Sequence, residues 1–369
     1  MRKKVKEKQY FLRKIELFLI KFYLESLNMT DNVTGQAYTL GLCDSLCYPL
    51  LIVFGLIILR KLFRSGKRHE TSNKVVVVTG CDSGFGRATV LAMIKEGYTV
   101  FAGCLNASNA EKDDSYQAIE KAAASRLHLM QMDVTKQDQI QQSLATVSEW
   151  LDQNKGFHLC AVVANAGIAH IFEDEMVSDE MFRQTMDVNF FGAVFTLKRY
   201  LPLLRKSNCQ YKTLVIVSSL ASQMPSPKFA SYGASKSAIY QWANCLRFEV
   251  KRFGIRISTV CPDFYATDMV TSEAVLNRQL DHYKTVDPEI LHLYGGHEKL
   301  EKKTKQIFKL LGKVACKDLS PVTDCISHAI ATSSPKMAYF PVRFFYKVLL
   351  VLHRISPRIT NKITQMLNK

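Results

Sequence analysis

The sequence of 369 residues contains no CxxC pair and no group of histidines and cysteines at metal-binding spacing. Its ten cysteines are scattered, so neither a metal site nor a disulfide framework is expected, and reduced thiols are the simpler interpretation. Internal repeats and low-complexity tracts are missing too, and nothing in the composition indicates disorder. What remains is a chain, 47% hydrophobic, that is long enough to bury a substantial core.

Acidic residues are fewer than basic ones, and the formal net charge is +16. Much of this charge is local, because residues 1–28 and residues 60–74 each carry a net charge of +5. These two segments flank the most apolar part of the chain. Basic residues in that position are typical of a membrane surface rather than of nucleic-acid binding. We therefore expect a membrane as a partner and no nucleic acid.

Long hydrophobic runs are also few, and the clearest spans residues 38–59, with Asp44 as its only charged residue. A membrane-spanning helix needs about 20 residues, so this run is long enough. No small-residue cleavage site follows, and the basic sequence RKLFR at 60–64 ends the run. The run is predicted to be a transmembrane signal anchor, with a buried helix or a signal peptide as the alternatives.

The basic residues after this run favour a cytosolic location for the rest of the chain. The basic start of the chain competes with that orientation, and Met29 is an alternative first residue, so both questions stay open. The expected organisation is a basic segment at 1–37, the anchor at 38–59, a basic linker at 60–73, a large domain at 74–275 and a helical extension at 276–369 that faces the membrane or the ligand of that domain.

From Lys74 onward, short aliphatic runs alternate with longer amphipathic segments. The runs KVVVVTG, TVFAGC, LHLMQMDV, LCAVVANAG, TLVIVSS and IRISTVCP are typical of buried strands. Helix-length segments such as 86–97, 136–153 and 234–253 follow them. Strict alternation predicts an α/β fold, a doubly wound parallel sheet of the Rossmann type with helices on both faces. After about residue 275 the pattern becomes helical and basic.

A glycine-rich turn, TGCDSGFG, stands between the first predicted strand and a helix that begins near Arg87. Gly80, Gly84 and Gly86 allow the backbone to turn tightly and to approach a pyrophosphate, whose charge the helix N-terminus favours. Glycine clusters alone are weak signals, but a strand before and a helix after are the context that a dinucleotide-binding turn needs.

The segment SYGASKSA places Tyr232 one helical turn before Lys236. Both side chains then lie on one face of a helix. A nearby cation lowers the pKa of a tyrosine from its usual value of about 10, which suits proton transfer. An ordinary helix with an exposed lysine is the alternative for this pair alone.

Together these motifs resemble the classical short-chain dehydrogenase/reductase family over about residues 74–270. The resemblance rests on TGxxxGxG at 79–86, NAG at 165–167, Asn189, VSS at 217–219 and YGASK at 232–236, in that order. The hydrophobic N-terminal run and the long C-terminal extension are similar to the branch with membrane-bound hydroxysteroid, retinol and 3-hydroxybutyrate dehydrogenases. The family's activity would make this chain an NAD(P)-dependent oxidoreductase acting on CH–OH groups.

The resemblance implies roles for four catalytic residues. Tyr232 would be the acid/base, and Lys236 would lower its pKa and hold the nicotinamide ribose. Ser219 would hydrogen-bond the substrate oxygen, with the neighbouring Ser218 as its competitor for that role. Asn189 would support a water-linked proton path to Lys236.

The resemblance also implies cofactor contacts at Thr79, Gly80, Ser83, Gly84, Phe85, Gly86, Asp133, Asn165, Ala166, Gly167, Tyr232, Lys236, Pro262 and Thr267. Asp133 would contact the adenine, although a helix N-cap is its plain alternative. Asn165 would brace the central sheet. The sequence departs from the family at Ala164, where asparagine is usual, and at Asp263, where glycine is usual. Asp263 implies either an ordinary backbone or about 1–3 kcal/mol of strain, and its charge near the nicotinamide would favour the oxidised cofactor.

Neither an acid for the ribose of NAD nor a base for the phosphate of NADP follows the second predicted strand. Cys104, Leu105 and Asn106 occupy that position, and Ser83 stands where NADP-preferring relatives often carry a base. Arg87 lies close enough to the glycine-rich turn to keep NADP as an alternative cofactor. We expect NAD.

The expected reaction interconverts a secondary alcohol and a ketone on a lipophilic substrate such as a steroid, sterol or retinoid. The aromatic stretch 339–352 would place the active site beside a membrane, most simply that of the endoplasmic reticulum. A 3-hydroxybutyrate dehydrogenase is the alternative, with residues 1–28 as a mitochondrial presequence. A non-catalytic nucleotide-binding scaffold and a homo-oligomer also stay open.

Overall fold

The computed structural model describes residues 68, 70–358, 360–361 and 363. The predicted anchor at 38–59, the basic segment before it and most of the linker after it lie outside the described residues. Within the described part of the chain, no helix is both long and apolar enough to cross a membrane. The described residues belong to one compact unit, Gly66–Lys369.

Seven strands form one parallel sheet in the order β3-β2-β1-β4-β5-β6-β7. The six aliphatic runs of the sequence are its first six strands, which confirms the predicted Rossmann-type sheet. Their bounds are β1 Lys74–Thr79, β2 Thr99–Cys104, β3 Leu127–Gln131, β4 His158–Ala164, β5 Lys212–Val217 and β6 Ile255–Val260. The short β7, Ala338–Tyr339, was not predicted, because its two residues carry no strand pattern of their own.

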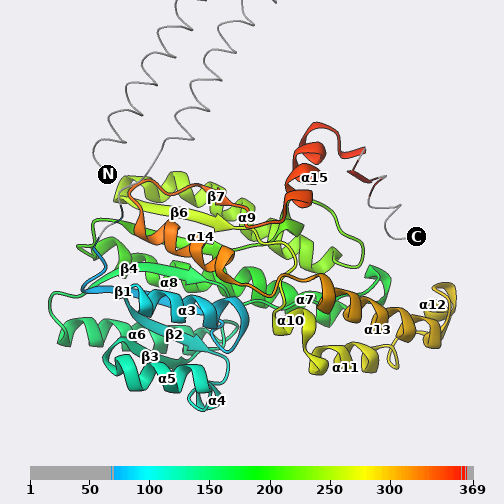
Figure 1. Ribbon diagram of the computed structural model, residues 1–369, viewed down its shortest axis with the longest axis horizontal. Coiled ribbons are helices and arrows are strands. Elements are labelled where there is room, and N and C mark those ends of the chain that lie inside the picture. Colours follow the sequence, from blue (N-terminus) through cyan, green and yellow to red (C-terminus); the bar gives the residue numbers. More distant parts are fainter. Residues whose placement is uncertain (1–67, 69, 359, 362, 364–369) are drawn as a thin grey trace, which may run out of the picture. The chain divides into compact units, whose positions relative to one another are not determined.

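Helices cover both faces of this sheet, as Figure 1 shows. Alternate residues of β1 point to opposite faces: Val76 and Val78 pack in one core, Val75 and Val77 in the other. The helices of the first core are α3 (Gly84–Lys95), α5 (Asp114–Ala123) and α14 (Ser320–Ala331), and those of the second are α6 (Gln137–Gln153), α8 (Ala193–Lys206) and α9 (Ala230–Val250). The short α4, Ala107–Ala110, follows β2. Strands buried on both faces explain the continuous aliphatic runs.

Beyond β6, the described part of the chain forms further helices besides α14. They are α10 (Asp268–Thr271), α11 (Glu273–His282), α12 (Pro288–Leu293), α13 (His297–Val314) and α15 (Phe344–Ile355). A small core of Phe172, Met176, Tyr283, Leu291 and Leu300 joins α11, α12 and α13 to the segment after β4. Between α13 and α15 the chain returns to the sheet as α14 and β7, so these helices are tied to the main domain at both ends.

Candidate active site

One cavity of about 1180 Å³ lies at the carboxyl ends of the strands. Residues that follow β1, β3, β4, β5 and β6 line it, as expected for ligand binding to an open α/β sheet. Pockets for a single small ligand usually measure about 300–1,000 Å³, so this volume suits a cofactor together with a substrate. Its outer wall comes from α10, α11, α13 and α15.

Tyr232 and Lys236 both lie in the first turns of α9 and line the cavity. The side chain of Lys236 is only 4% exposed, and its Nζ donates a hydrogen bond of 3.1 Å to the carbonyl of Val217 at the end of β5. The same Nζ is 5.8 Å from the centre of the Tyr232 ring. Lys236 is therefore buried beside Tyr232 and is not the exposed lysine of the plain alternative.

The two neighbouring serines after β5 have different surroundings. The buried Ser218 donates from Oγ to the backbone carbonyl of Lys236 at 2.9 Å, which commits it to α9. Ser219 forms a side-chain hydrogen bond with Tyr232, and its Oγ also accepts from the backbone N–H of Ala221 at 3.1 Å. This geometry favours Ser219 over Ser218 for contact with a substrate oxygen at Tyr232.

Burial shifts the pKa values of the Tyr232 and Lys236 side chains in opposite directions. Removal from water raises the pKa of Tyr232, and its hydrogen bond with Ser219 acts against that rise. Burial lowers the pKa of Lys236 to about 8. At pH 7 Lys236 is therefore still protonated in most molecules, and its positive charge is available to stabilise a phenolate.

Asn189 lies behind the cavity wall rather than in it. It belongs to a π-helical turn, Asp187–Gly192, an irregularity that is frequent at functional sites. Its amide oxygen accepts from the N–H of Ile168 at 2.8 Å, and its Nδ2 donates at 2.9 Å to both the carbonyl of Ile168 and Ser235 Oγ. Asn189 thus joins the loop after β4 to the helix that carries Tyr232 and Lys236.

The glycines of the turn after β1 are required by their surroundings. Gly80 has a φ of +67°, and a Cβ on it would lie 2.6 Å from the Cα of Ala166. A Cβ on Gly86 would lie 1.9 Å from the carbonyl oxygen of Gly80. The turn leads directly into α3, whose N-terminus favours a phosphate. The residues present therefore fit the pyrophosphate of a dinucleotide.

Thr79 and Asn165 join the ends of β1 and β4. Thr79 Oγ1 accepts from the backbone N–H groups of Asn165 at 3.0 Å and Ala166 at 3.1 Å. Asn165 Nδ2 donates to the carbonyls of Thr79 at 2.9 Å and Gly80 at 3.0 Å. Among the expected cofactor contacts, Thr79 and Gly86 lie outside the cavity lining. Those that line it are Gly80, Ser83, Gly84, Phe85, Asp133, Asn165, Ala166, Gly167, Tyr232, Lys236, Pro262 and Thr267.

Asp133 lines the cavity and also stabilises a turn. Its Oδ1 accepts from Thr135 through the backbone N–H at 2.9 Å and the hydroxyl at 2.8 Å. Helix α6 begins at Gln137 with Lys136 at the N-cap, so the helix-capping alternative for Asp133 is wrong.

Sequence reasoning missed Asp82, which lines the cavity beside the end of β2. Its carboxylate accepts from the backbone N–H groups of Leu105 at 2.8 Å and Asn106 at 2.9 Å. The position after β2, which holds no acid in the sequence, thus receives one from the glycine-rich turn. Arg87 forms an ion pair with Asp113. The sequence held one signal for this contact: β1 and β2 were both predicted, and the carboxyl ends of neighbouring parallel strands lie side by side.

Asp263 has an ordinary backbone conformation. It is not among the described residues that have a positive φ. The strain alternative is therefore wrong. Its side chain is 0% exposed, and its Oδ2 accepts from Arg343 through both the backbone N–H and Nε at 3.0 Å. The next two residues also contact the C-terminal segment: the Phe264 ring lies 6.3 Å from that of Tyr346, and Tyr265 donates to the carbonyl of Pro341 at 2.8 Å. Asp263 thus ties the turn after β6 to the start of α15.

This pairing changes the effect expected of substitutions at Asp263, because the positive charge of Arg343 offsets the negative charge of the carboxylate. Arg343→Met leaves the buried carboxylate without its charged partner, with only the backbone N–H of residue 343 still donating to it. The substitution is expected to lower the free energy of unfolding by about 2–3 kcal/mol, whereas Asp263→Asn costs less. Both variants should raise KM for substrate more than they change the ratio of oxidised to reduced cofactor affinity. Urea unfolding and cofactor titrations measure these effects. A large change in the affinity ratio with unchanged KM would contradict this interpretation.

The fold and this site define an enzyme that oxidises or reduces alcohol groups with NAD(P). Residues 74–275 match the profile of the short chain dehydrogenase family, and the chain belongs to that family. A short-chain dehydrogenase from Streptomyces avermitilis has the same fold, with a TM-score of 0.58 and 21% identity over 81% of this chain and 98% of that one.

The chain is similar in sequence to dehydrogenases that are named for different substrates. The chain is 34% identical to 17-beta-hydroxysteroid dehydrogenase type 2 of Homo sapiens, over 85% of this chain and 80% of that protein. It is 29% identical to the mitochondrial D-beta-hydroxybutyrate dehydrogenase of Rattus norvegicus, over 92% and 95% of the two chains. It is also 29% identical to retinol dehydrogenase 5 of Homo sapiens, over 79% and 88%. The protein is thus a short-chain oxidoreductase related to hydroxysteroid, hydroxybutyrate and retinol dehydrogenases.

Proposed function

We propose that this enzyme interconverts a secondary alcohol and a ketone on a lipophilic, steroid-like or retinoid-like substrate. The observation that carries the proposal is the pairing of Tyr232 and Ser219 at one side of a cavity whose outer wall is largely apolar. That wall includes Val270, Val275, Ile307, Leu310, Phe345 and Leu349. Apolar side chains favour a substrate that leaves water readily, and a few polar groups then orient it.

NAD(P), when bound, accepts or donates the hydride. Tyr232 exchanges the proton of the substrate oxygen, because its hydroxyl forms a hydrogen bond with Ser219 and both residues line the cavity. Ser219 holds the same oxygen and so orients the reacting carbon. The charge of the buried Lys236 favours the phenolate form of Tyr232, and Asn189 keeps the loop after β4 and α9 in register.

We assign NAD rather than NADP as the preferred cofactor. The carboxylate of Asp82 lies against the backbone of Leu105 and Asn106, where the adenosine ribose of a dinucleotide would bind. A negative charge there accepts hydrogen bonds from ribose hydroxyls and repels a phosphate. Arg87, the base that kept NADP open, is already paired with Asp113.

Asp82→Asn is expected to raise the ratio of kcat/KM for NADP to that for NAD by about tenfold, because the repulsive charge is removed. The exposed Asp152→Asn is the matched control and should leave the ratio unchanged. Steady-state kinetics with both cofactors measure it. An unchanged ratio in Asp82→Asn would assign the cofactor preference to other residues.

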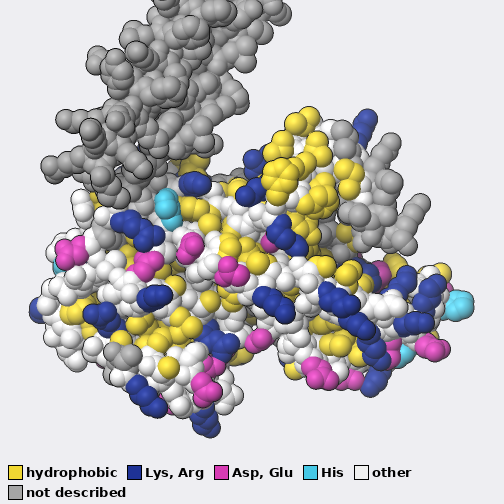
Figure 2. Space-filling view, viewed as in Figure 1, with side chains coloured by type: hydrophobic (Ala, Val, Ile, Leu, Met, Phe, Trp, Pro, Cys, Tyr) yellow, Lys and Arg dark blue, Asp and Glu magenta, His cyan; other side chains and the backbone are white. Residues whose placement is uncertain are grey.

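The organisation proposed for the chain keeps an anchor at 38–59 and a catalytic domain on the cytosolic side of the endoplasmic reticulum. A second membrane contact is supported by α15. Its exposed side chains include Phe344, Phe345, Val348, Val351 and Ile355, which recur every three or four residues. Figure 2 shows hydrophobic side chains gathered over α15 with basic ones beside them. Such a helix suits the interface of an anionic membrane.

The full chain is therefore expected to sediment with membranes and to resist extraction by alkaline carbonate. A variant that lacks residues 1–64 should bind anionic vesicles only peripherally and be released by carbonate, because α15 lies at the surface rather than across the bilayer. Fractionation and immunoblotting measure both. Extraction of the full chain by carbonate would contradict the anchor and favour a peripheral or imported protein.

A second candidate activity is the oxidation of 3-hydroxybutyrate, favoured by the nearly full-length match to a hydroxybutyrate dehydrogenase. A panel of a steroid alcohol, retinol and 3-hydroxybutyrate, followed by NAD(P)H absorbance, separates the two. We expect turnover of the steroid or the retinoid. Turnover of 3-hydroxybutyrate alone would replace the first candidate, and no turnover of any member would contradict both.

A further inference from the structure

Two buried polar side chains, His170 and Gln279, line the cavity away from the Tyr232 helix. His170 is 7% exposed and Gln279 is 3% exposed. In the part of the chain that the structure describes, neither the Oε1 nor the Nε2 of Gln279 has a hydrogen-bond partner, and the Nε2 of His170 has none either.

Unpaired buried polar atoms are costly. A buried donor or acceptor without a partner destabilises a protein, and buried polar groups in native proteins nearly always have partners. Leucine fills about the same space as glutamine at no such cost. The unpaired amide of Gln279 therefore calls for a partner that the described residues do not supply.

The local structure holds the two side chains on well-packed elements. On α11, Val275, Arg278, Gln279 and His282 are spaced three or four residues apart, so they share one face. That face meets the segment after β4, because the His282 ring lies 4.8 Å from that of Phe172.

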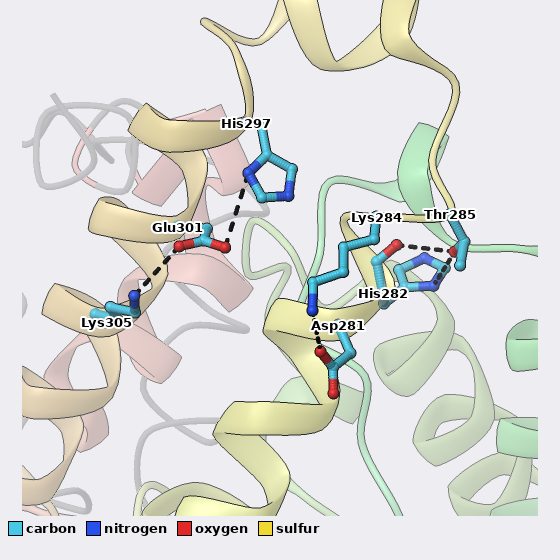
Figure 3. Close-up of polar contacts among 7 residues, drawn as sticks. All are labelled: Asp281, His282, Lys284, Thr285, His297, Glu301 and Lys305. Atoms are coloured by element: carbon cyan, nitrogen blue, oxygen red, sulfur yellow. Dashed lines mark hydrogen bonds and ion pairs between the residues drawn. The ribbon is translucent and has the colours of Figure 1, made fainter.

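The imidazole of His282 is held from two sides. Its Nε2 is 2.7 Å from the carbonyl of Met176, and its Nδ1 is 3.2 Å from Thr285 Oγ1. Figure 3 shows the contact with Thr285 at the end of α11, and the separate chain of ion pairs from His297 through Glu301 to Lys305 on α13. His282 therefore fixes α11 against the segment that carries His170.

The chemistry of the two groups defines what they bind. An amide both donates and accepts hydrogen bonds, and so does a neutral imidazole. Burial, with Arg278 and His282 nearby, lowers the pKa of His170, although its hydrogen bond with Gln184 opposes this, so the ring is neutral at pH 7. Charges of both signs, Glu180 and Arg278, line the same cavity, which does not favour a carboxylate.

We propose that His170 and Gln279 form a second polar subsite, which recognises a hydroxyl or carbonyl oxygen on the substrate other than the oxygen that reacts at Tyr232. This inference rests on the proposed function, because it takes the cavity to hold a lipophilic alcohol. It narrows the substrate class to molecules with two separate oxygen functions on an apolar frame.

The test compares a steroid that has a hydroxyl group at each end with its analogue that keeps only the reacting hydroxyl. The wild-type enzyme should bind the diol about tenfold more tightly, since loss of a ligand oxygen leaves the amide unpaired. In Gln279→Leu this preference should fall to about twofold or less, with affinity for the single alcohol retained. Binding is measured by fluorescence titration with NADH present, and turnover is measured in parallel.

Thermal unfolding of the ligand-free protein gives a readout that does not depend on activity. Gln279→Leu should melt at or above the temperature of the wild type, because an unpaired amide is removed. Gln241→Leu, an exposed position on α9, is the control. A clear fall in melting temperature, or a preference for the diol that persists in Gln279→Leu, would overturn the subsite. Binding that follows this pattern without turnover of either steroid would instead contradict the proposed reaction.

Discussion

Tyr232→Phe is expected to lower turnover by about three orders of magnitude while leaving cofactor affinity within about twofold. The substitution removes only the phenolic oxygen, which is the group that exchanges a proton with the substrate in the proposed reaction. The ring stays in place, so its contact with Phe229, at 6.0 Å between ring centres, is preserved. Steady-state assays and fluorescence titration with NADH measure the two effects.

A matched control lies on the same helix. Tyr240 is two turns further along α9 and is outside the cavity lining, so Tyr240→Phe should retain nearly full turnover. Near-normal activity in Tyr232→Phe would contradict the whole assignment of the acid/base. Equal losses in both variants would point to a structural effect on α9 instead.

Lys236→Met is expected to lower kcat/KM by at least a hundredfold, because the cation beside Tyr232 is lost. The substitution should not lower the free energy of unfolding. Burial of the charge lowers the pKa of Lys236 from 10.5 to about 8, so the charged form costs up to about 3 kcal/mol at neutral pH. Its hydrogen bond with the carbonyl of Val217 recovers part of that cost. At pH 7 the variant should therefore be at least as stable as the wild type.

The sign of the pH dependence follows from this shift. Between pH 8 and pH 10.5 the unfolded state holds a proton on Lys236 that the folded state has released. The free energy of unfolding therefore rises with pH across this range. The cost of burying the charged lysine is absent above the pKa of the unfolded state and is present in full below the pKa of the folded state. The wild type should gain stability relative to Lys236→Met as pH rises from 7 to 9.5, measured by urea unfolding. Parallel pH profiles in the two proteins would contradict a buried, titrating Lys236.

Much of the fold was predictable from local patterns. A strand buried on both faces needs a continuous aliphatic run, and a helix on one face of the sheet needs an amphipathic one, so β1 to β6 and their helices could be read directly. The one-turn spacing of Tyr232 and Lys236 is equally local. The glycines of the turn after β1 were recognised from the strand before them and the helix after them, and the close approach of Gly80 to Ala166 gives a physical reason for that pattern. Asn165 came from a family resemblance.

Other features depend on pairs of residues far apart in the sequence. The carboxylate of Asp82 reaches Leu105 only because β1 and β2 are neighbours, and Asp263 meets Arg343, 80 residues later, only because the chain returns through β7. Each residue alone is an ordinary acid on a turn. Their partners could not be read from spacing, because no local period connects them.

The sequence by itself determined the alternation of strands and helices, the glycine turn and the Tyr232–Lys236 pair, because short-range sterics and burial act on neighbouring residues. Tertiary structure alone decided which residue supplies the acid beside β2 and which polar groups line the outer cavity. Those outcomes depend on the order of strands in the sheet and on how α11 and α15 pack over it, since long-range packing brings the groups within hydrogen-bonding distance.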